Sequence, residues 1–221
     1  MTALLAPTYF GPVQWYQKLF RYPRVVIDVC DSYQKQTYRN RCLIAAANGV
    51  QALTVPVQSQ RSDGGLPSAA SPYVSFHGHW QHQHWQALQS AYGDSPFFEY
   101  YEDDLRPFFT ETDRWPLLYD YDEAIRRKLC ELLDIQPCVV PPPIPTPLSS
   151  GKERPSAALS PEGSAPFHDF RSAIHPKHAA PDADFQPRRY YQVYEQKHGF
   201  LPNLSILDLL FNMGPESVFY L

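Results

Sequence analysis

The first 57 residues alternate between strand-like and helix-like segments, and this alternation restricts the fold more than any other feature of the sequence. Residues 4–10 (LLAPTYF) are typical of a short strand, and residues 13–20 (VQWYQKLF) place their apolar side chains on one helical face. Residues 24–29 (RVVIDV) are β-branched and compact, as buried strands are. A strand, a helix and another strand in this order predict an α/β fold with a mixed or mostly parallel sheet flanked by helices.

The middle of the chain adds a hairpin and three helices. Asn48-Gly49 is a strong turn dipeptide between two apolar, strand-compatible segments. Proline ends helices, so the second of the three helices should stop near Pro107, while Asp120 and Glu123 can form a capping box for the third. The three helices are predicted at residues 84–92, 97–109 and 121–133.

The last 32 residues predict a strand followed by a helix. Residues 190–194 (YYQVY) are rich in aromatic residues, which favour strands. In the helix at residues 203–211 (NLSILDLLF), Asn203 or Ser205 can serve as the N-cap, and Gly214 can end the helix.

Length and composition favour one domain over residues 1–221. A chain of 221 residues that is 43% hydrophobic can bury a substantial core, so global disorder is not expected. Two excursions interrupt the pattern. Residues 58–76 are rich in Gly, Ser and Pro, and about 137–167 is rich in Pro, so both predict flexible or polyproline-II segments.

Charge, hydropathy and cysteine content exclude several classes of function. A net charge of −4 provides no basic field for nucleic acid, so no nucleic-acid partner is expected. No run of about 18 apolar residues is present, and the N-terminus lacks a signal-peptide pattern, so no membrane span or secretion is expected. The four cysteines form no CxxC pair, and reduced thiols are consistent with a cytoplasmic protein.

A polar, partly cationic segment follows the predicted strand at residues 24–29. If residues 35–41 are extended, Lys35, Arg39 and Arg41 point to one side, where guanidinium groups could bind a phosphate or carboxylate. Alternatively, these cations form ordinary surface ion pairs with the acidic stretch at residues 99–123. The polar residues of this segment are Asp28, Asp31, Lys35, Arg39, Asn40 and Arg41.

Histidines form a second polar group, in FHGHWQHQHW. Such tracts can bind Zn²⁺ or Ni²⁺, but the surrounding sequence is a Gly/Ser-rich loop without a fixed ligand spacing, so no metal site is predicted. His84, placed at the start of the predicted helix 84–92, is the best candidate for a general acid or base. Helix capping, or packing against Trp80 and Trp85, is the alternative. The four histidines are His77, His79, His82 and His84.

Several segments together resemble the WbqC-like protein family. They are PTYFGPVQWYQKLF, VVIDVCDSYQKQTYRNRCLIAAANGVQALTVPV, HWQALQSAYGDSPFFEYYEDDLRPFF, DFRSAIHPK and YQVYEQKHGFLPNLSILDLLFNMGPES. The resemblance covers most of the chain outside residues 58–76 and about 137–167. It implies a role in surface-polysaccharide biosynthesis, such as that of O-antigen, with glycine or aminoacyl transfer to a sugar as the suggested activity.

Acyl transfer to a sugar needs a site for an anionic donor, a base for the acceptor and a donor to the developing oxyanion. On this hypothesis the substrate is a small molecule or sugar nucleotide. The base is His84 or Asp31, and Asn40 supports the oxyanion. The sequence specifies no cofactor. The residues expected to bind substrate are Lys35, Arg39, Arg41 and Tyr92.

Two other functions remain open. The strand, turn, helix and strand at the beginning resemble the opening of nucleotide-binding enzymes, although YFGPVQWY stands where nucleotidylyltransferases carry HxGH. A non-catalytic binding or scaffold protein is the other alternative, with the Pro-rich stretch as a partner surface. Neither GxGxxG, GxxxxGK[ST], GxSxG nor HExxH occurs.

Overall fold

A four-stranded parallel sheet forms one end of the molecule. The computed structural model describes residues 1–29, 33–58, 71–141, 167–177 and 179–221. The strand order is β7 (Val139–Val140), β2 (Arg24–Ile27), β1 (Thr2–Leu5) and β8 (Phe167–Asp169), and all neighbours are parallel. β1 is buried along its whole length, as a central strand of a parallel sheet should be. The predicted α/β class is therefore confirmed.

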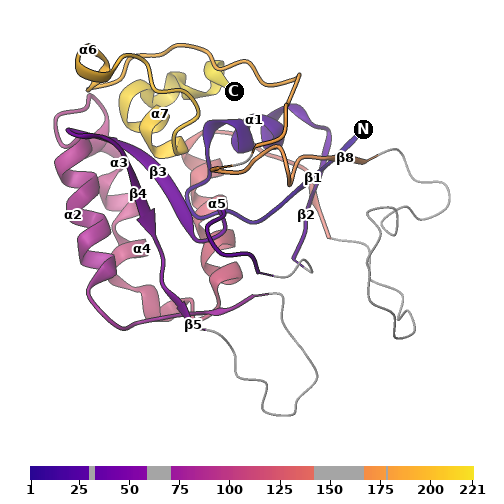
Figure 1. The fold of residues 1–221 in the computed structure, drawn as a ribbon, viewed down its shortest axis with the longest axis horizontal. Coiled ribbons are helices and arrows are strands. Elements are labelled where there is room, and N and C mark those ends of the chain that lie inside the picture. Colours follow the sequence, from indigo (N-terminus) through magenta and orange to yellow (C-terminus); the bar gives the residue numbers. More distant parts are fainter. Residues whose placement is uncertain (30–32, 59–70, 142–166, 178) are drawn as a thin grey trace.

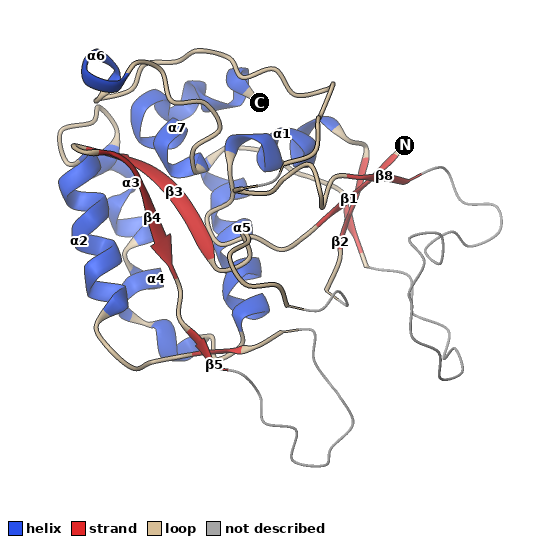
Figure 2. Ribbon diagram, viewed as in Figure 1, coloured by secondary structure: helices blue, strands red, loops and turns tan. Residues whose placement is uncertain are grey.

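Outside this sheet, most of the regular secondary structure is helical. In Figures 1 and 2, α2, α3 and α4 lie at the end opposite the parallel strands, and α1 and α7 lie together near the C-terminus. The helices are α1 (Val13–Arg21), α2 (Trp80–Tyr92), α3 (Phe98–Leu105), α4 (Pro107–Thr110), α5 (Leu118–Leu132), α6 (Glu195–His198) and α7 (Ile206–Met213), with 3₁₀ segments η1 (Thr112–Arg114) and η3 (Gly214–Tyr220).

Two small antiparallel pairs complete the structure. β3 (Arg41–Ala46) and β4 (Gly49–Thr54) form the predicted hairpin, and Gly49 adopts the positive φ of 107° that its turn requires. β5 (Val57–Gln58) pairs with β6 (Tyr73–Val74). The hairpin contacts α2 and α7, so it connects the helical end of the molecule with the C-terminal segment.

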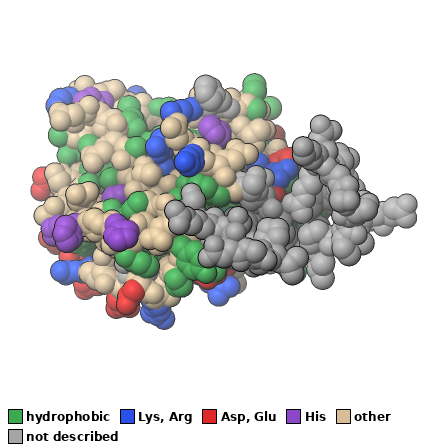
Figure 3. Space-filling model, turned by 60° about the horizontal axis from the view of Figure 1, so that its bottom comes forward, with side chains coloured by type: hydrophobic (Ala, Val, Ile, Leu, Met, Phe, Trp, Pro, Cys, Tyr) green, Lys and Arg blue, Asp and Glu red, His purple; other side chains and the backbone are tan. Residues whose placement is uncertain are grey.

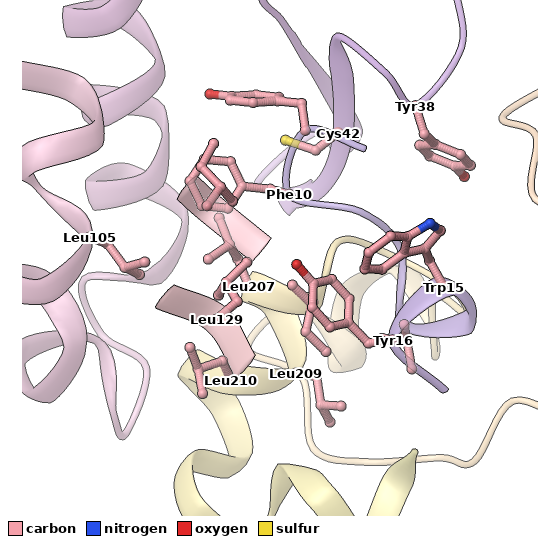
Figure 4. Close-up of a cluster of buried hydrophobic side chains, with 14 of the residues drawn as sticks. Phe10, Trp15, Tyr16, Tyr38, Cys42, Leu105, Leu129, Leu207, Leu209 and Leu210 are labelled. Carbon is pink, nitrogen blue, oxygen red and sulfur yellow. The ribbon is translucent and has the colours of Figure 1, made fainter. Parts of the chain in front are cut away.

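The core joins the beginning of the chain to its end. Figure 4 shows Tyr16 of α1 near Leu209 of α7, with Trp15 beside Tyr16 and Leu129 of α5 on its other side. Each of these side chains is at most 2% exposed. Full burial of a large apolar side chain contributes roughly 1.5–3 kcal/mol, so this cluster is a main source of stability.

Three local expectations are wrong. Residues 35–40 form turns instead of a strand, with Gln36 at a φ of +64°, so Lys35, Arg39 and Arg41 do not share a strand face. Residues 190–194 are irregular, because the Tyr190 side chain donates a hydrogen bond to buried Asp208. α5 begins at Leu118 without a side-chain cap, so the expected capping box of Asp120 and Glu123 is absent.

The residues that limit α7 at both ends agree with the prediction. The Ser205 hydroxyl accepts a hydrogen bond from the Leu207 amide, which makes Ser205 the N-cap of α7. Gly214 follows the helix with a positive φ of 56°.

The two predicted excursions fall largely on residues outside the described part of the chain, namely 59–70 and 142–166. Their ends are described, and they contribute to β5, β6, β7 and β8. Among the described helices, none combines the length and apolar character needed to cross a lipid bilayer.

Candidate functional site

A small pocket lies at the carboxyl ends of β1 and β2. In open parallel sheets ligands bind outside the carboxyl ends of the strands, so the position itself is typical of a functional site. The pocket is built from four separate parts of the chain. Its lining residues are Pro7, Asp28, Val29, Tyr33, Arg39, Ser71, Pro72, Leu118, Tyr119 and Asp122.

Asp28 carries the charge at the end of β2. Its Oδ2 accepts a hydrogen bond from Arg171 Nη1 at 2.6 Å, and the same guanidinium binds Asp169 at 2.6 Å. Asp169 is the last residue of β8. An arginine shared by two carboxylates thus connects the ends of β2 and β8 beside the pocket.

Asp122 enters the pocket from α5. It is 3% exposed, and its Oδ1 atom has no hydrogen-bond partner among the described residues. Burial raises the pKa of Asp122 well above its usual range, and the positive charge of Arg39 only partly offsets this effect. A buried carboxyl group with a raised pKa in a pocket is a candidate acid or base.

The predicted cations lie in different environments. Arg39 is 6% exposed and lines the pocket, where its charge acts on Tyr33 and Asp122. Lys35 is exposed on the preceding turn. Arg41 is half-buried at the start of β3, and its Nε donates to Thr54 Oγ1 across the hairpin at 3.2 Å. Of the three, only Arg39 is part of the pocket wall.

His84 lies in the second turn of α2 rather than at its start, which corrects the expected helix boundary. Its Nδ1 is 2.9 Å from the Tyr9 hydroxyl, the ring packs edge-on against Trp80, and the Thr54 carbonyl accepts from the ring. Burial lowers the pKa of His84 to about 4. A neutral ring can satisfy both polar contacts by donating to Thr54 and accepting from Tyr9.

Tyr92 and Asn40 are both buried. The Tyr92 hydroxyl donates to Asp208 Oδ1 at 2.9 Å and accepts from the Ala45 amide at 3.1 Å, so it connects α2, α7 and β3. Asn40 Nδ2 donates to the Val55 carbonyl at 2.8 Å, and its Oδ1 has no partner among the described residues. Asp31 lies outside the described residues. The catalytic and binding roles of all these residues stay predictions.

The sequence does not indicate Asp122 or Tyr119 as site residues, because the acidic stretch at residues 99–123 is typical of a surface that forms ion pairs. The spacing of α5 contains a signal that could have identified Asp122. Leu118, Ile125 and Leu129 are buried, and Asp122 stands four residues after the first and three before the second. It therefore occupies an apolar position of the helical repeat, where an ionisable side chain is unusual.

Comparison with known proteins identifies the family of this chain. A family model described as the WbqC-like protein family matches residues 6–142 and 171–220, which is more than half of the chain. The chain belongs to the WbqC-like protein family. The uncharacterized protein Rv1507c of Mycobacterium tuberculosis is 28% identical over 199 residues, which cover 86% of this chain and 83% of that protein. No solved structure matches.

The lining residues of the pocket all fall in the first segment that matches the WbqC-like family. Arg171, which binds Asp28 beside the pocket, is the first residue of the second matched segment. Residues 143–170 separate the two segments and contain β8.

The histidines and cysteines of this WbqC-like protein form no metal cluster within the described residues. His77, His79 and His82 are exposed. Cys30 lies outside the described residues, Cys138 is exposed, and Cys42 and Cys130 are buried. Burial raises the pKa of Cys130 to about 11, so this buried thiol is poorly suited to act as a nucleophile.

Two observations bear on nucleotide and nucleic-acid binding by the WbqC-like fold. The N-terminus of α1 is occupied, because the Val13 amide donates to the Leu204 carbonyl and the Gln14 amide donates to Asn203 Oδ1. Phosphates that bind helix N-termini need such amides, so the phosphate site of the nucleotide-binding analogy is filled here. On the face in Figure 3, basic and acidic side chains are interspersed rather than gathered into one basic patch.

Proposed function

We propose that this WbqC-like protein is a transferase of surface-polysaccharide biosynthesis that moves glycine or another aminoacyl group to a sugar. The observation that carries the proposal is the pocket at the carboxyl ends of β1 and β2, in which Arg39 and Asp122 are both buried. Burying two ionisable side chains in a pocket costs stability, and such a cost is common where a ligand must be bound. Family membership supports the class of substrate.

The two side chains suit the two halves of an acyl transfer. The guanidinium of Arg39 can bind the phosphate of a sugar nucleotide or of an activated donor, because guanidinium groups pair bidentately with such anions. The carboxylate of Asp122 can accept a proton from the attacking group. We assign the base to Asp122 instead of His84, because both polar contacts of His84 are already made within the protein.

We also propose that the protein works in the cytoplasm. The buried thiols of Cys42 and Cys130 are free, as is usual in a reducing compartment.

Binding of a panel of nucleotide-linked sugars, measured by thermal shift and calorimetry, tests the proposal. At least one member should raise the melting temperature of the wild type, because a ligand that binds only the folded state stabilises it. Arg39→Gln should weaken its binding by about tenfold or more, the effect of losing a charge-assisted hydrogen bond.

Arg127→Gln is the matched control, because Arg127 is an exposed arginine on α5 that pairs with Glu123. It should leave the affinity unchanged. If no nucleotide-linked sugar binds, or if both variants weaken binding equally, the pocket is not the substrate site, and a binding or scaffold protein becomes the better description.

A further inference from the structure

We propose that the group meeting Asp122 in the pocket is a primary amine, so that the acceptor is an amino sugar and Asp122 removes the proton of its ammonium form. This inference rests on the proposed function, because it names the acceptor of the same site. It follows from three features of the described pocket: an unpartnered carboxylate oxygen, the charges around it and the aromatic side chains that line the wall.

The first feature is the Oδ1 atom of Asp122. It is buried and accepts no hydrogen bond from the described residues, whereas its neighbours in the pocket include two tyrosines and an arginine. A buried acceptor without a donor costs about 1–3 kcal/mol, and more when it is charged. A ligand that brings a donor to this atom removes that cost on binding. An ammonium group brings three donors and no acceptor.

The second feature is the distribution of charge around the pocket. Asp28, the other carboxylate of the wall, is held by Arg171 at 2.6 Å, and Arg171 is shared with Asp169. Asp122 has no such contact at ion-pair distance among the described residues, although Arg39 acts on it electrostatically. A ligand cation would therefore gain more from Asp122 than from Asp28.

The third feature is the pair of aromatic side chains in the pocket wall. Tyr33 and Tyr119 line the same wall, and burial raises the pKa of both hydroxyl groups, so both remain neutral at physiological pH. Aromatic rings attract cations electrostatically, and neutral phenol groups can donate hydrogen bonds to sugar hydroxyls. The part of the wall around Asp122 therefore suits a sugar that carries an amino group.

The proton transfer from the ammonium group to Asp122 conserves both charge and atoms. The ammonium R–NH₃⁺ transfers one proton to Asp122 Oδ1, which leaves a neutral amine with a free lone pair and a neutral carboxylic acid. A buried carboxyl group holds a proton more readily than an exposed one, so burial favours this transfer. The neutral amine is the form of the acceptor that can attack an acyl carbon.

The experiment compares two nucleotide-linked sugars that differ at one carbon, where one carries a primary amine and the other a hydroxyl group. Calorimetry on the full chain at pH 7.5 should show about tenfold tighter binding of the amino sugar, which corresponds to one charge-assisted contact. D122N should lose this preference and bind both sugars within about threefold of each other, because the amide is uncharged. D120N alters an exposed carboxylate on the same helix and should keep the preference.

The possible results separate the amine assignment from the proposed function. Equal affinity of the wild type for the two sugars, or a preference retained in D122N, overturns the amine assignment while the proposed function stands. Absence of binding by both sugars, together with absence of binding by every other nucleotide-linked sugar of the panel, overturns the proposed function and the amine assignment with it. The wild-type comparison needs no variant, so the assignment stays falsifiable even if D122N does not fold.

Discussion

Two buried aspartates show how one residue type can serve structure or function. Asp208 on α7 is fully buried, and it accepts hydrogen bonds from Tyr92 at 2.9 Å, from Tyr190 at 2.7 Å and from Gln192 at 2.8 Å. Burial raises the pKa of Asp208, but these three donors counteract the shift. Asp122 is buried to a similar degree without such donors to its Oδ1 atom. The first carboxylate is therefore held in place by the fold, whereas the second has an oxygen atom that no described residue binds.

His84 should make the stability of the protein depend on pH. Its pKa is about 4 in the folded state and about 6.5 in an unfolded chain. Between these values the unfolded chain binds a proton that the folded protein does not, so the contribution of His84 to stability is complete above pH 6.5 and is lost as the pH falls towards 4. The expected loss is roughly 3 kcal/mol.

Urea unfolding of the wild type and of His84→Gln from pH 4 to pH 7 measures this contribution. The glutamine does not titrate, so the pH dependence in this window should be smaller in the variant by about that amount. His82→Gln is the control, because His82 is exposed on the same helix. A wild-type pH dependence in the His84→Gln protein would contradict the buried, neutral state of this ring.

At the scale of elements, a buried ion pair attaches α1 to the C-terminal part of the chain. Lys18 Nζ lies 2.9 Å from Asp182 Oδ2, and the two side chains are 1% and 5% exposed. Burial by itself would raise the pKa of Asp182, but hydrogen bonds from Lys18 and Gln14 lower it. Lys18 also stands over the ring of Phe170, 4.6 Å from its centroid.

Removing one partner of this pair should therefore be costly. Lys18→Met should lower the free energy of unfolding by about 3–5 kcal/mol, because it leaves Asp182 without its buried counter-ion, and the double variant Lys18→Met with Asp182→Asn should recover much of the loss. Denaturant titration of the wild type, the single variants and the double variant measures the coupling.

Lys128→Met is the control for this prediction. Lys128 pairs with Asp104 at the surface, where the two side chains are 27% and 42% exposed, and its loss should cost no more than about 1 kcal/mol. Equal losses for the two lysine variants would show that the Lys18 pair is not a specific attachment of α1.

The elements that sequence predicted correctly are those specified by local chemistry. Asn48-Gly49 defined the hairpin, and Ser205 with Gly214 defined the limits of α7, because each signal acts within a few residues. Residues 190–194 have the composition of a strand, yet the side chain of Tyr190 is bound to Asp208 from another element. Tertiary contacts of this kind override the local preference for a strand, and they cannot be recognised in the sequence of the segment itself.

At the scale of the whole molecule, the candidate site was the least predictable feature. Its wall combines the ends of β1 and β2, the loop before β3, residues 71 and 72, and α5. The periodicity of a sequence shows on which face of its own helix or strand a residue lies. It does not show which faces of different elements pack against one another. Arg39 was therefore identified by its chemistry, whereas Asp122 needed the structure to show that its helix face borders the same pocket.

The described fold suggests that most of residues 143–165 can be removed. β7 and β8 are separated by β2 and β1, a lateral distance of about 14 Å at the usual strand spacing. Because the strands are parallel, the connection must also return to the amino end of β8, and a Gly/Ser linker of about fifteen residues can span the whole path. The family match also omits residues 143–170. Replacing residues 143–165 by such a linker should change the melting temperature by less than about 5 °C, because the length of the connection between two fixed elements has a weak effect on stability.

Differential scanning calorimetry of the wild type and of the linker variant measures this change in melting temperature. Deletion of α7 is the contrasting variant and should abolish folding, because Leu207, Leu209 and Leu210 are completely buried. If the linker variant also fails to fold, residues 143–165 are required by the parallel sheet.

The position of β1 has a consequence for the protein during its synthesis. β1 begins at Thr2, but one of its two edges pairs with residues 167–169, which follow β1 by about 160 residues along the chain. While the ribosome is still adding those residues, that edge has no native partner, and an apolar strand with an open edge invites association with other chains. We therefore expect the nascent polypeptide to depend on chaperones until translation has passed β8.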